Sequence, residues 1–203
     1  MTSLNSGFKL TLMKKWYLFV CLIIFFGCDR PPLIKDYKIE KIGVGDSLLN
    51  IISKEEIEKQ ISNPEKSYYM LDPPNKFVPI IKKNNLDTYY ELEIFVEPND
   101  NKYIAKSIHG RMSNINLNSC LDKKSKIVLE FSDMFKNAKR EEDSIFETII
   151  DSKRTVYESK FTFKDGNQVM IQCYNYSELN IASNNHLLIG ISSKEISDWL
   201  STW

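Results

Sequence analysis

Two runs of alternating residues around an Asp-Gly pair place the strongest constraint on the fold. The stretch is TVYESKFTFKDGNQVMIQCYNY, residues 155–176. Asp165-Gly166 favours the positive φ angles of a type I′ hairpin turn. Apolar residues share one face of each flanking run, namely Tyr157, Phe161, Phe163, Val169, Ile171 and Cys173. The pattern predicts a β-hairpin with one buried face.

Further strands are predicted on both sides of this hairpin. TYYELEIFVE (88–97) alternates apolar and acidic residues, and YIAKSIHGRM (103–112) follows after the turn-forming PNDNK. These two runs predict a second hairpin. HLLIGIS (186–192) reads as a fifth strand, and FVPII (77–81), interrupted by Pro79, fits at most a strand at a sheet edge.

Three helices are expected. Ser53 followed by Glu56 is a capping box, which predicts a helix over 54–61 that buries Ile57. An apolar stripe from Cys120 to Ala138 predicts the longest helix within 117–143, with Ser119 and Asp122 at its start. Its lysines are expected to face solvent. A closing helix is predicted over 196–200, after a cap at 192–195.

Hairpin-joined strands that come in runs, with helices between the runs, indicate an antiparallel sheet. The predicted fold class is therefore α+β, with a sheet of about five strands and helices packed on one face. The expected single domain covers residues 38–203, preceded by a tether at 29–37 that contains Pro31-Pro32.

The N-terminal region reads as a targeting segment. Lys14 and Lys15 precede an uncharged run, Trp16–Gly27, of twelve residues. A membrane-spanning helix needs about 20 apolar residues, so this run is too short to span and matches a secretory signal. We therefore assign residues 1–28 as a signal peptide. Residues 1–12 fit poorly before such a signal, and we interpret Met13 as the better start.

The residues IFFGC, 24–28, resemble a bacterial lipoprotein box, in which a small residue such as Gly27 precedes an acylated cysteine. Phe25 stands where that box prefers Leu. The resemblance implies that Cys28 is lipidated and becomes the mature N-terminus. An ordinary secretory signal and an uncleaved anchor are the alternatives. The remaining domain is similar to uncharacterised small exported proteins of AT-rich marine bacteria, on the residues IGVGDSLLNIISKEEIEKQI, YIAKSIHGRM and the helix containing Cys120; that similarity carries no function.

Whether the cysteines are expected to form a disulfide depends on whether the chain is exported. Cys21 lies in the signal, and Cys28 would carry lipid, which leaves Cys120 and Cys173. A pair in an oxidising compartment predicts a disulfide. Two free buried thiols are the alternative if the chain is not exported.

Charge and motifs exclude several classes of function. Three of the 27 basic residues and none of the 27 acidic residues precede Cys28, so the rest of the chain has a net charge of −3, which offers no basic surface for nucleic acid. The two histidines, His109 and His186, lie 77 residues apart without metal-ligand spacing. We expect His109 to be an ordinary sheet residue and His186 to lie at the surface. No cofactor is expected.

Two weak site signals remain. Glu91, Glu93 and Glu97 share a strand face and could hold a cation, but a solvated row is the preferred interpretation. The tripeptide 45–47, Gly-Asp-Ser, also occurs in certain esterases, but no Asp-x-x-His follows it here, so we expect Asp46 to cap a short helical turn over 47–51 instead. No catalytic residue is assigned.

The expected function is that of a lipid-anchored cell-envelope protein. It would face the periplasm, contact the membrane through its lipid, and bind or scaffold an envelope protein without catalysis. The alternatives are a secreted form, and an envelope hydrolase or other enzyme with an unfamiliar site. The sequence leaves the oligomeric state open.

Overall fold

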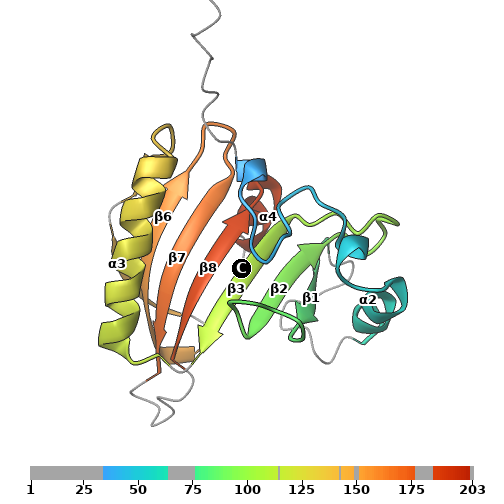
Figure 1. Cartoon of the computed structure of the whole chain (residues 1–203), viewed down its shortest axis with the longest axis horizontal. Helices are drawn as coiled ribbons and strands as arrows, with labels where there is room; N and C mark the ends of the chain where they lie inside the picture. Colours follow the sequence, from blue (N-terminus) through green and yellow to red (C-terminus); the bar gives the residue numbers. More distant parts are fainter. Residues whose placement is uncertain are drawn as a thin grey trace, which may run out of the picture. The chain divides into compact units, whose positions relative to one another are not determined.

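An antiparallel sheet organises the chain (Figure 1). The computed structural model describes residues 34–63, 76–113, 115–141, 143–148, 151–176 and 185–201, which belong to one unit that spans Pro32–Trp203. The predictions for the signal peptide, for a start at Met13 and for Cys28 fall outside the described residues.

The sheet has eight strands within the described residues, rather than the five predicted. The strands are β1 (Val78–Lys82), β2 (Glu91–Val96), β3 (Ser107–Ser113), β4 (Lys139–Arg140), β5 (Ser144–Thr148), β6 (Asp151–Thr162), β7 (Gln168–Asn175) and β8 (His186–Ser192). Their order is β1-β2-β3-β8-β7-β6-β4, and β5 also pairs with β6. All pairs are antiparallel, as predicted.

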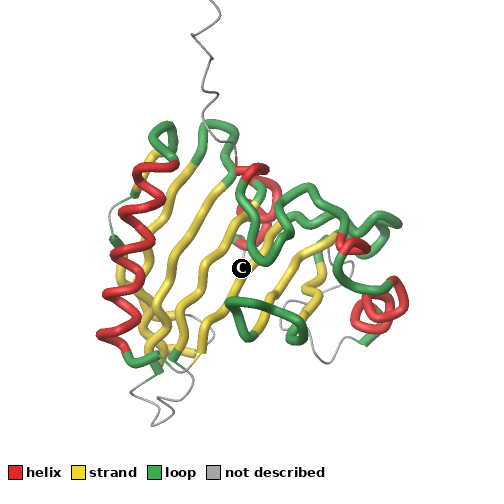
Figure 2. Tube along the Cα trace, viewed as in Figure 1, coloured by secondary structure: helices red, strands yellow, loops and turns green. Residues whose placement is uncertain are grey.

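The helices lie on both faces of the sheet, so the prediction that they share one face is wrong. The helical segments are the 3₁₀ turns η1 (Ile34–Asp36) and η2 (Leu48–Asn50) and the helices α2 (Lys54–Ile61), α3 (Leu117–Met134) and α4 (Lys194–Leu200). Helix α3 packs against β7 and, less extensively, β8. Figure 2 shows it as the long helix that runs alongside the long strands. Neighbouring residues of β2 point to opposite faces: Ile94 joins the main core, whereas Phe95 packs with Ile196 of α4 and Phe77.

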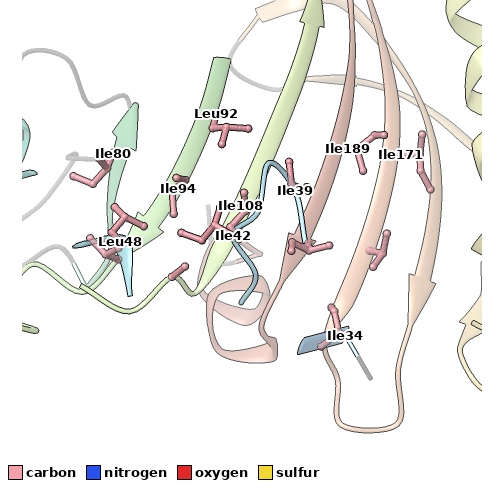
Figure 3. Close-up of a cluster of buried hydrophobic side chains, with 14 of the residues drawn as sticks. Ile34, Ile39, Ile42, Leu48, Ile80, Leu92, Ile94, Ile108, Ile171 and Ile189 are labelled. Carbon is pink, nitrogen blue, oxygen red and sulfur yellow. The ribbon is translucent and has the colours of Figure 1, made fainter. Parts of the chain in front are cut away.

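The main core fills the face that α3 covers. Strands β2, β3, β7 and β8 supply its aliphatic side chains, and the segment before α2 adds further residues, as Figure 3 shows for Ile34, Ile39, Ile42 and Leu48. Tyr37 packs edge-on against Phe131 with ring centroids 5.1 Å apart. Residues 34–37, predicted as part of the tether, therefore belong to the packed domain.

Side-chain caps mark the starts of α2 and α3, whereas Ser193, the N-cap residue of α4, makes no side-chain capping hydrogen bond. Helix α2 has the predicted bounds, and the Ser53 hydroxyl accepts the Glu56 amide at 3.2 Å. Helix α3 is capped by Asn116, whose side chain accepts the Ser119 amide at 2.9 Å, instead of by Ser119 itself. Helix α4 begins at Lys194, two residues before the predicted start.

The Asp-Gly hairpin forms, but its turn differs from prediction. A type I′ turn needs a positive φ angle at both residues, but Asp165 is not among the described residues with positive φ, whereas Gly166 has φ +82°. The Gly166 amide donates to Phe163 O, and the Phe163 amide donates to Asn167 O, both at 2.9 Å. This pattern is typical of a three-residue loop that ends in a left-handed glycine.

Helix α3 places Cys120 against the sheet. Cys120 and Cys173 are both buried, and their Cα atoms lie 5.9 Å apart. Bridged cysteines have Cα separations of about 4.4–6.8 Å. The structure thus permits the predicted disulfide between α3 and β7. Among the described helices, none has both the length and the apolar character needed to cross a membrane.

Candidate functional site

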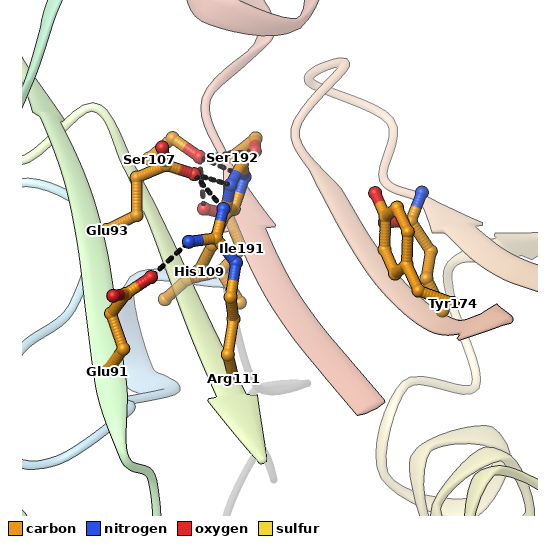
Figure 4. Close-up of polar contacts among 9 residues, drawn as sticks. Glu91, Glu93, Ser107, His109, Arg111, Tyr174, Ile191 and Ser192 are labelled. Carbon is orange, nitrogen blue, oxygen red and sulfur yellow. Dashed lines mark hydrogen bonds and ion pairs between the residues drawn. The ribbon is translucent and has the colours of Figure 1, made fainter. Parts of the chain in front are cut away.

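The face of the sheet opposite α3 carries a polar cluster on β2, β3 and β8 (Figure 4). Its members are Glu91, Glu93, Ser107, His109, Arg111 and Ser192. Strand register explains the assembly, because directly opposite residues share a face. Glu93 pairs with His109, Glu91 with Arg111, and Ser107 with Ser192. We call these six residues the polar cluster.

His109 connects a carboxylate to a hydroxyl. Its Nδ1 lies 3.4 Å from Glu93 Oε2, and its Nε2 lies 3.0 Å from Ser107 Oγ. Ser107 Oγ also donates to Ile191 O at 3.1 Å and lies 2.7 Å from Ser192 Oγ. A carboxylate, an imidazole and a hydroxyl follow one another in the order found at an activated serine, but the hydroxyl has a single proton and donates it to Ile191 O instead of to His109.

A glycine makes room for this histidine. Gly190 lies directly opposite His109 on β8. A Cβ atom at position 190 would come within 2.9 Å of both His109 Cδ2 and Met170 Cγ. The absence of a side chain at Gly190 therefore allows His109 and Met170 to lean over β8.

Arg111 joins the two glutamates. Its Nη2 lies 2.9 Å from Glu93 Oε2, and its Nη1 pairs with Glu91 Oε1. Lys83 adds a second cation 3.1 Å from Glu91 Oε2. With Lys83, two cations therefore face the two carboxylates of the polar cluster.

The surroundings of Glu93 and Arg111 favour the charged form of each side chain. Burial raises the pKa of Glu93, but the hydrogen bond with His109 and the charge of Arg111 outweigh burial and hold that pKa below its usual value. Burial also lowers the pKa of Arg111, but the Glu93 and Glu91 carboxylates outweigh it and raise that pKa. A buried charge of this kind persists because each partner stabilises the other.

Burial decides what the polar cluster can do chemically. Ser107 and Ser192 have no exposed surface, and His109 is 7% exposed. A substrate must reach the nucleophile's oxygen before that oxygen can attack. In this conformation no substrate can contact Ser107, so the cluster ties β2, β3 and β8 together and presents no open reaction site.

The acidic residues of β2 differ from the predicted solvated row. Glu91 and Glu93 are buried, so the expectation of a solvated acidic row is wrong for both. Glu97 pairs with Lys106 at 2.8 Å. The described residues contain no group of three or more His, Cys, Asp or Glu residues that could hold a metal ion.

The histidines differ in outcome. His109 is a buried sheet residue, as predicted. His186 was expected at the surface, but it is 8% exposed and stacks on Tyr174 with ring centroids 4.5 Å apart. That prediction is wrong because β8 places His186 beside Tyr174 of β7.

Other predicted residues lie elsewhere. Asp46 was expected to cap the turn η2, but Ser47 does so: its hydroxyl accepts the Leu49 amide at 3.3 Å and donates to Lys102 O at 2.6 Å. The Asp46 carboxylate instead accepts the Gly43 amide at 2.9 Å. Lys124 was expected to face solvent, but it is 5% exposed and lies 3.4 Å from Asp143. Asp143 also accepts a hydrogen bond from Ser159 of β6.

Sequence reasoning missed Ser107, Arg111 and Ser192 as members of the polar cluster. The alternation of Ser107, His109 and Arg111 on one face of a predicted strand was the available signal. That signal was incomplete because Ser192 joins the cluster only through the register of β3 against β8, and these strands lie far apart in the sequence.

Comparison with known proteins adds no assignment. No family model, no curated protein and no solved structure matches the chain.

Proposed function

We propose that this chain is a lipid-anchored protein of the cell envelope whose domain binds or scaffolds another envelope protein without catalysis. The N-terminal pattern supports export, and Cys28 would carry the lipid. Ile34 is already a core residue. The chain between Cys28 and Ile34 can extend at most about 20 Å, so the anchor would hold the domain close to the membrane surface.

The observation that carries the non-catalytic role is the burial of Ser107, which has no exposed surface. Its oxygen already contacts His109, Ser192 and Ile191. A fully engaged polar network favours a structural role, because each buried polar group needs its partner for stability.

The same proposal joins Cys120 and Cys173 in a disulfide. The oxidising environment outside the cytoplasm supports the bond, and the Cα separation of 5.9 Å suits it. Peptide mapping without reductant tests it on envelope material. A peptide pair that contains both cysteines supports the bond, whereas two free thiols contradict it.

Replacement of Cys28 tests the anchor. Cys28→Ala should abolish acyl labelling and move the protein out of the membrane fraction, because lipid chains supply the membrane affinity. Cys21→Ala is the matched control, since it removes a thiol from the same stretch and should leave both readouts intact. Unchanged labelling and fractionation of Cys28→Ala would rule out the lipid anchor.

A hydrolase is the second candidate, and the distances from His109 to Glu93 and Ser107 specifically favour it. A fluorophosphonate probe reacts with activated serines and distinguishes the two functions. The binding role predicts no labelling of the folded wild type. Labelling that disappears in Ser107→Ala but persists in Ser47→Ala would instead establish the hydrolase.

A further inference from the structure

The two edges of the sheet differ in how far other parts of the chain cover them. At one edge, the Gln60 side chain of α2 donates from Nε2 to Ile81 O at 3.0 Å and accepts the Ile81 amide at 2.8 Å. The Gln60 side chain therefore forms hydrogen bonds with both the amide and the carbonyl of Ile81 in β1. Exposed edge strands are templates for pairing with another chain, and such covers protect them.

The other edge is exposed. Strands β4 and β5 both pair with β6 on the side away from β7. Residues 144–147 of β5 are exposed, and two of them are large and apolar: Ile145 is 67% exposed and Phe146 is 39% exposed. Apolar residues on an exposed edge strand mark a surface that another strand can cover.

Two of the charged residues along this edge, Arg140 and Glu147, lie symmetrically about one position of β6. Arg140 lies opposite Phe161 of β6, and Glu147 lies opposite Thr155. The midpoint between those β6 positions is Glu158, which lies opposite Ser144. Phe161 and Thr155 are separated by an even number of residues, so Arg140 and Glu147 lie on the same face of the sheet.

We propose that a second copy of this chain pairs with the β4–β5 edge in antiparallel orientation, around a twofold axis beside Ser144. The axis places Arg140 of each copy opposite Glu147 of the other, and Ser144 opposite its own equivalent. Ile145 of each copy then lies next to the axis as a diagonal neighbour of its equivalent, about 7–8 Å away.

Self-complementarity favours a second copy over an unrelated partner. A twofold interface requires each patch to be complementary to itself. This edge meets the requirement with a cation and an anion at equal distances from Ser144. Arg140 already lies 3.6 Å from Asp143, and its five donors can serve both carboxylates. The interface is small, so the association is weak and concentration-dependent.

A cysteine on the axis tests the proposal in the full chain. Directly opposite antiparallel residues have Cα atoms about 4.5–5.5 Å apart, within disulfide range. Ser144→Cys should therefore give a covalent dimer on a non-reducing gel under mild oxidation. Ser125→Cys, at an exposed site on α3, is the control and should stay monomeric. A monomeric Ser144→Cys, or equal crosslinking of both variants, overturns the proposal.

Charge exchange tests the register in the Ser144→Cys background. Glu147→Lys places like charges across both ends of the interface and should reduce the crosslinked fraction several-fold. Adding Arg140→Glu restores opposite charges and should restore crosslinking. Crosslinking that ignores both changes would refute this register.

A matched pair of variants tests the apolar contribution without crosslinking. Ile145→Lys should abolish self-association in sedimentation equilibrium. Leu129→Lys, at a similarly exposed position on α3, should not. A wild type that stays monomeric up to millimolar concentration, or equal effects of the two variants, would also overturn the proposal.

Discussion

At the scale of single residues, Arg111 neutralises the buried carboxylates of Glu91 and Glu93. Removing one member of a buried ion pair leaves an uncompensated charge, which costs more than the pair itself contributes. The polar cluster is therefore the place where a single change should most disturb the sheet outside its apolar core.

Arg111→Ala should lower the free energy of unfolding by about 3–5 kcal/mol, because Glu93 would remain buried without its cation. Lys83→Ala removes an exposed cation from Glu91 and should cost less than about 1 kcal/mol. Urea unfolding of both variants measures the difference. Equal and small effects would mean that Arg111 is not needed to neutralise the cluster.

Acid should weaken the fold through Glu93. Its pKa is lower in the folded chain than its ordinary value, so its ionised form stabilises the fold above the unfolded pKa of about 4.3. That stability is lost as the pH falls through the folded pKa. Glu93→Gln should therefore show a shallower fall in unfolding free energy below about pH 5 than the wild type.

A control carboxylate completes that experiment. Glu130→Gln, at an exposed position on α3, should retain the wild-type dependence on pH. If Glu93→Gln and the wild type lose stability in parallel on acidification, the ionised form of Glu93 does not contribute to the fold.

At the scale of elements, the sequence predicted those whose pattern and ends agree. Helix α2 and strand β8 have the predicted bounds, because Ser53 caps the former and an unbroken apolar run marks the latter. Strands β4 and β5 were missed. Residues 139–140 and 144–147 are exposed, so no buried alternating face marks these strands, and the charged run at 139–143 resembled the end of a helix.

The polar cluster was harder to predict than the elements that carry it. Each of its strands was expected, and His109 and Glu93 were each weighed alone. Their contact depends on strand register and on the space above Gly190. Alternation predicts the β2–β3 hairpin without fixing its register, and the pairing of β3 with β8, which lies far along the chain, is a tertiary property that a local pattern does not determine.

Helix α3 should depend on Phe131. This side chain is 4% exposed and packs against Phe135, Phe161 and Tyr37. Phe131→Ala should cost about 3–5 kcal/mol of unfolding free energy, since it removes an aromatic ring and leaves a cavity.

The neighbouring Leu129→Ala supplies the comparison, because Leu129 is 66% exposed and should tolerate truncation with little change. Thermal and urea unfolding measure both variants. A near-neutral Phe131→Ala would contradict the packing of α3 on the sheet.

The bridge between α3 and β7 should stabilise the fold. Cys120 and Cys173 are separated by 53 residues in sequence, and closing a loop of that size contributes about 4 kcal/mol in the chain-entropy model. Reductant should therefore lower wild-type stability markedly. The double variant Cys120→Ala/Cys173→Ala should be less stable from the outset and should not respond to reductant; an equal response of both proteins would exclude the bridge.

At the scale of the whole molecule, the proposed role depends on the N-terminal segment that ends at Cys28. The short apolar run before Cys28 supports the proposal of export. On that proposal, export would supply the oxidising surroundings for Cys120 and Cys173, and a lipid would hold the domain at a membrane. Tethering would also raise the local concentration of each copy and so favour the proposed weak contact through the β4–β5 edge.

The N-terminus of the native protein tests this account most directly. Mass spectrometry of the protein purified from its own membranes should find a chain that begins at Cys28 and carries the added mass of acyl groups. A soluble cytoplasmic protein that still begins at Met1 or Met13, with unmodified Cys28, would contradict it.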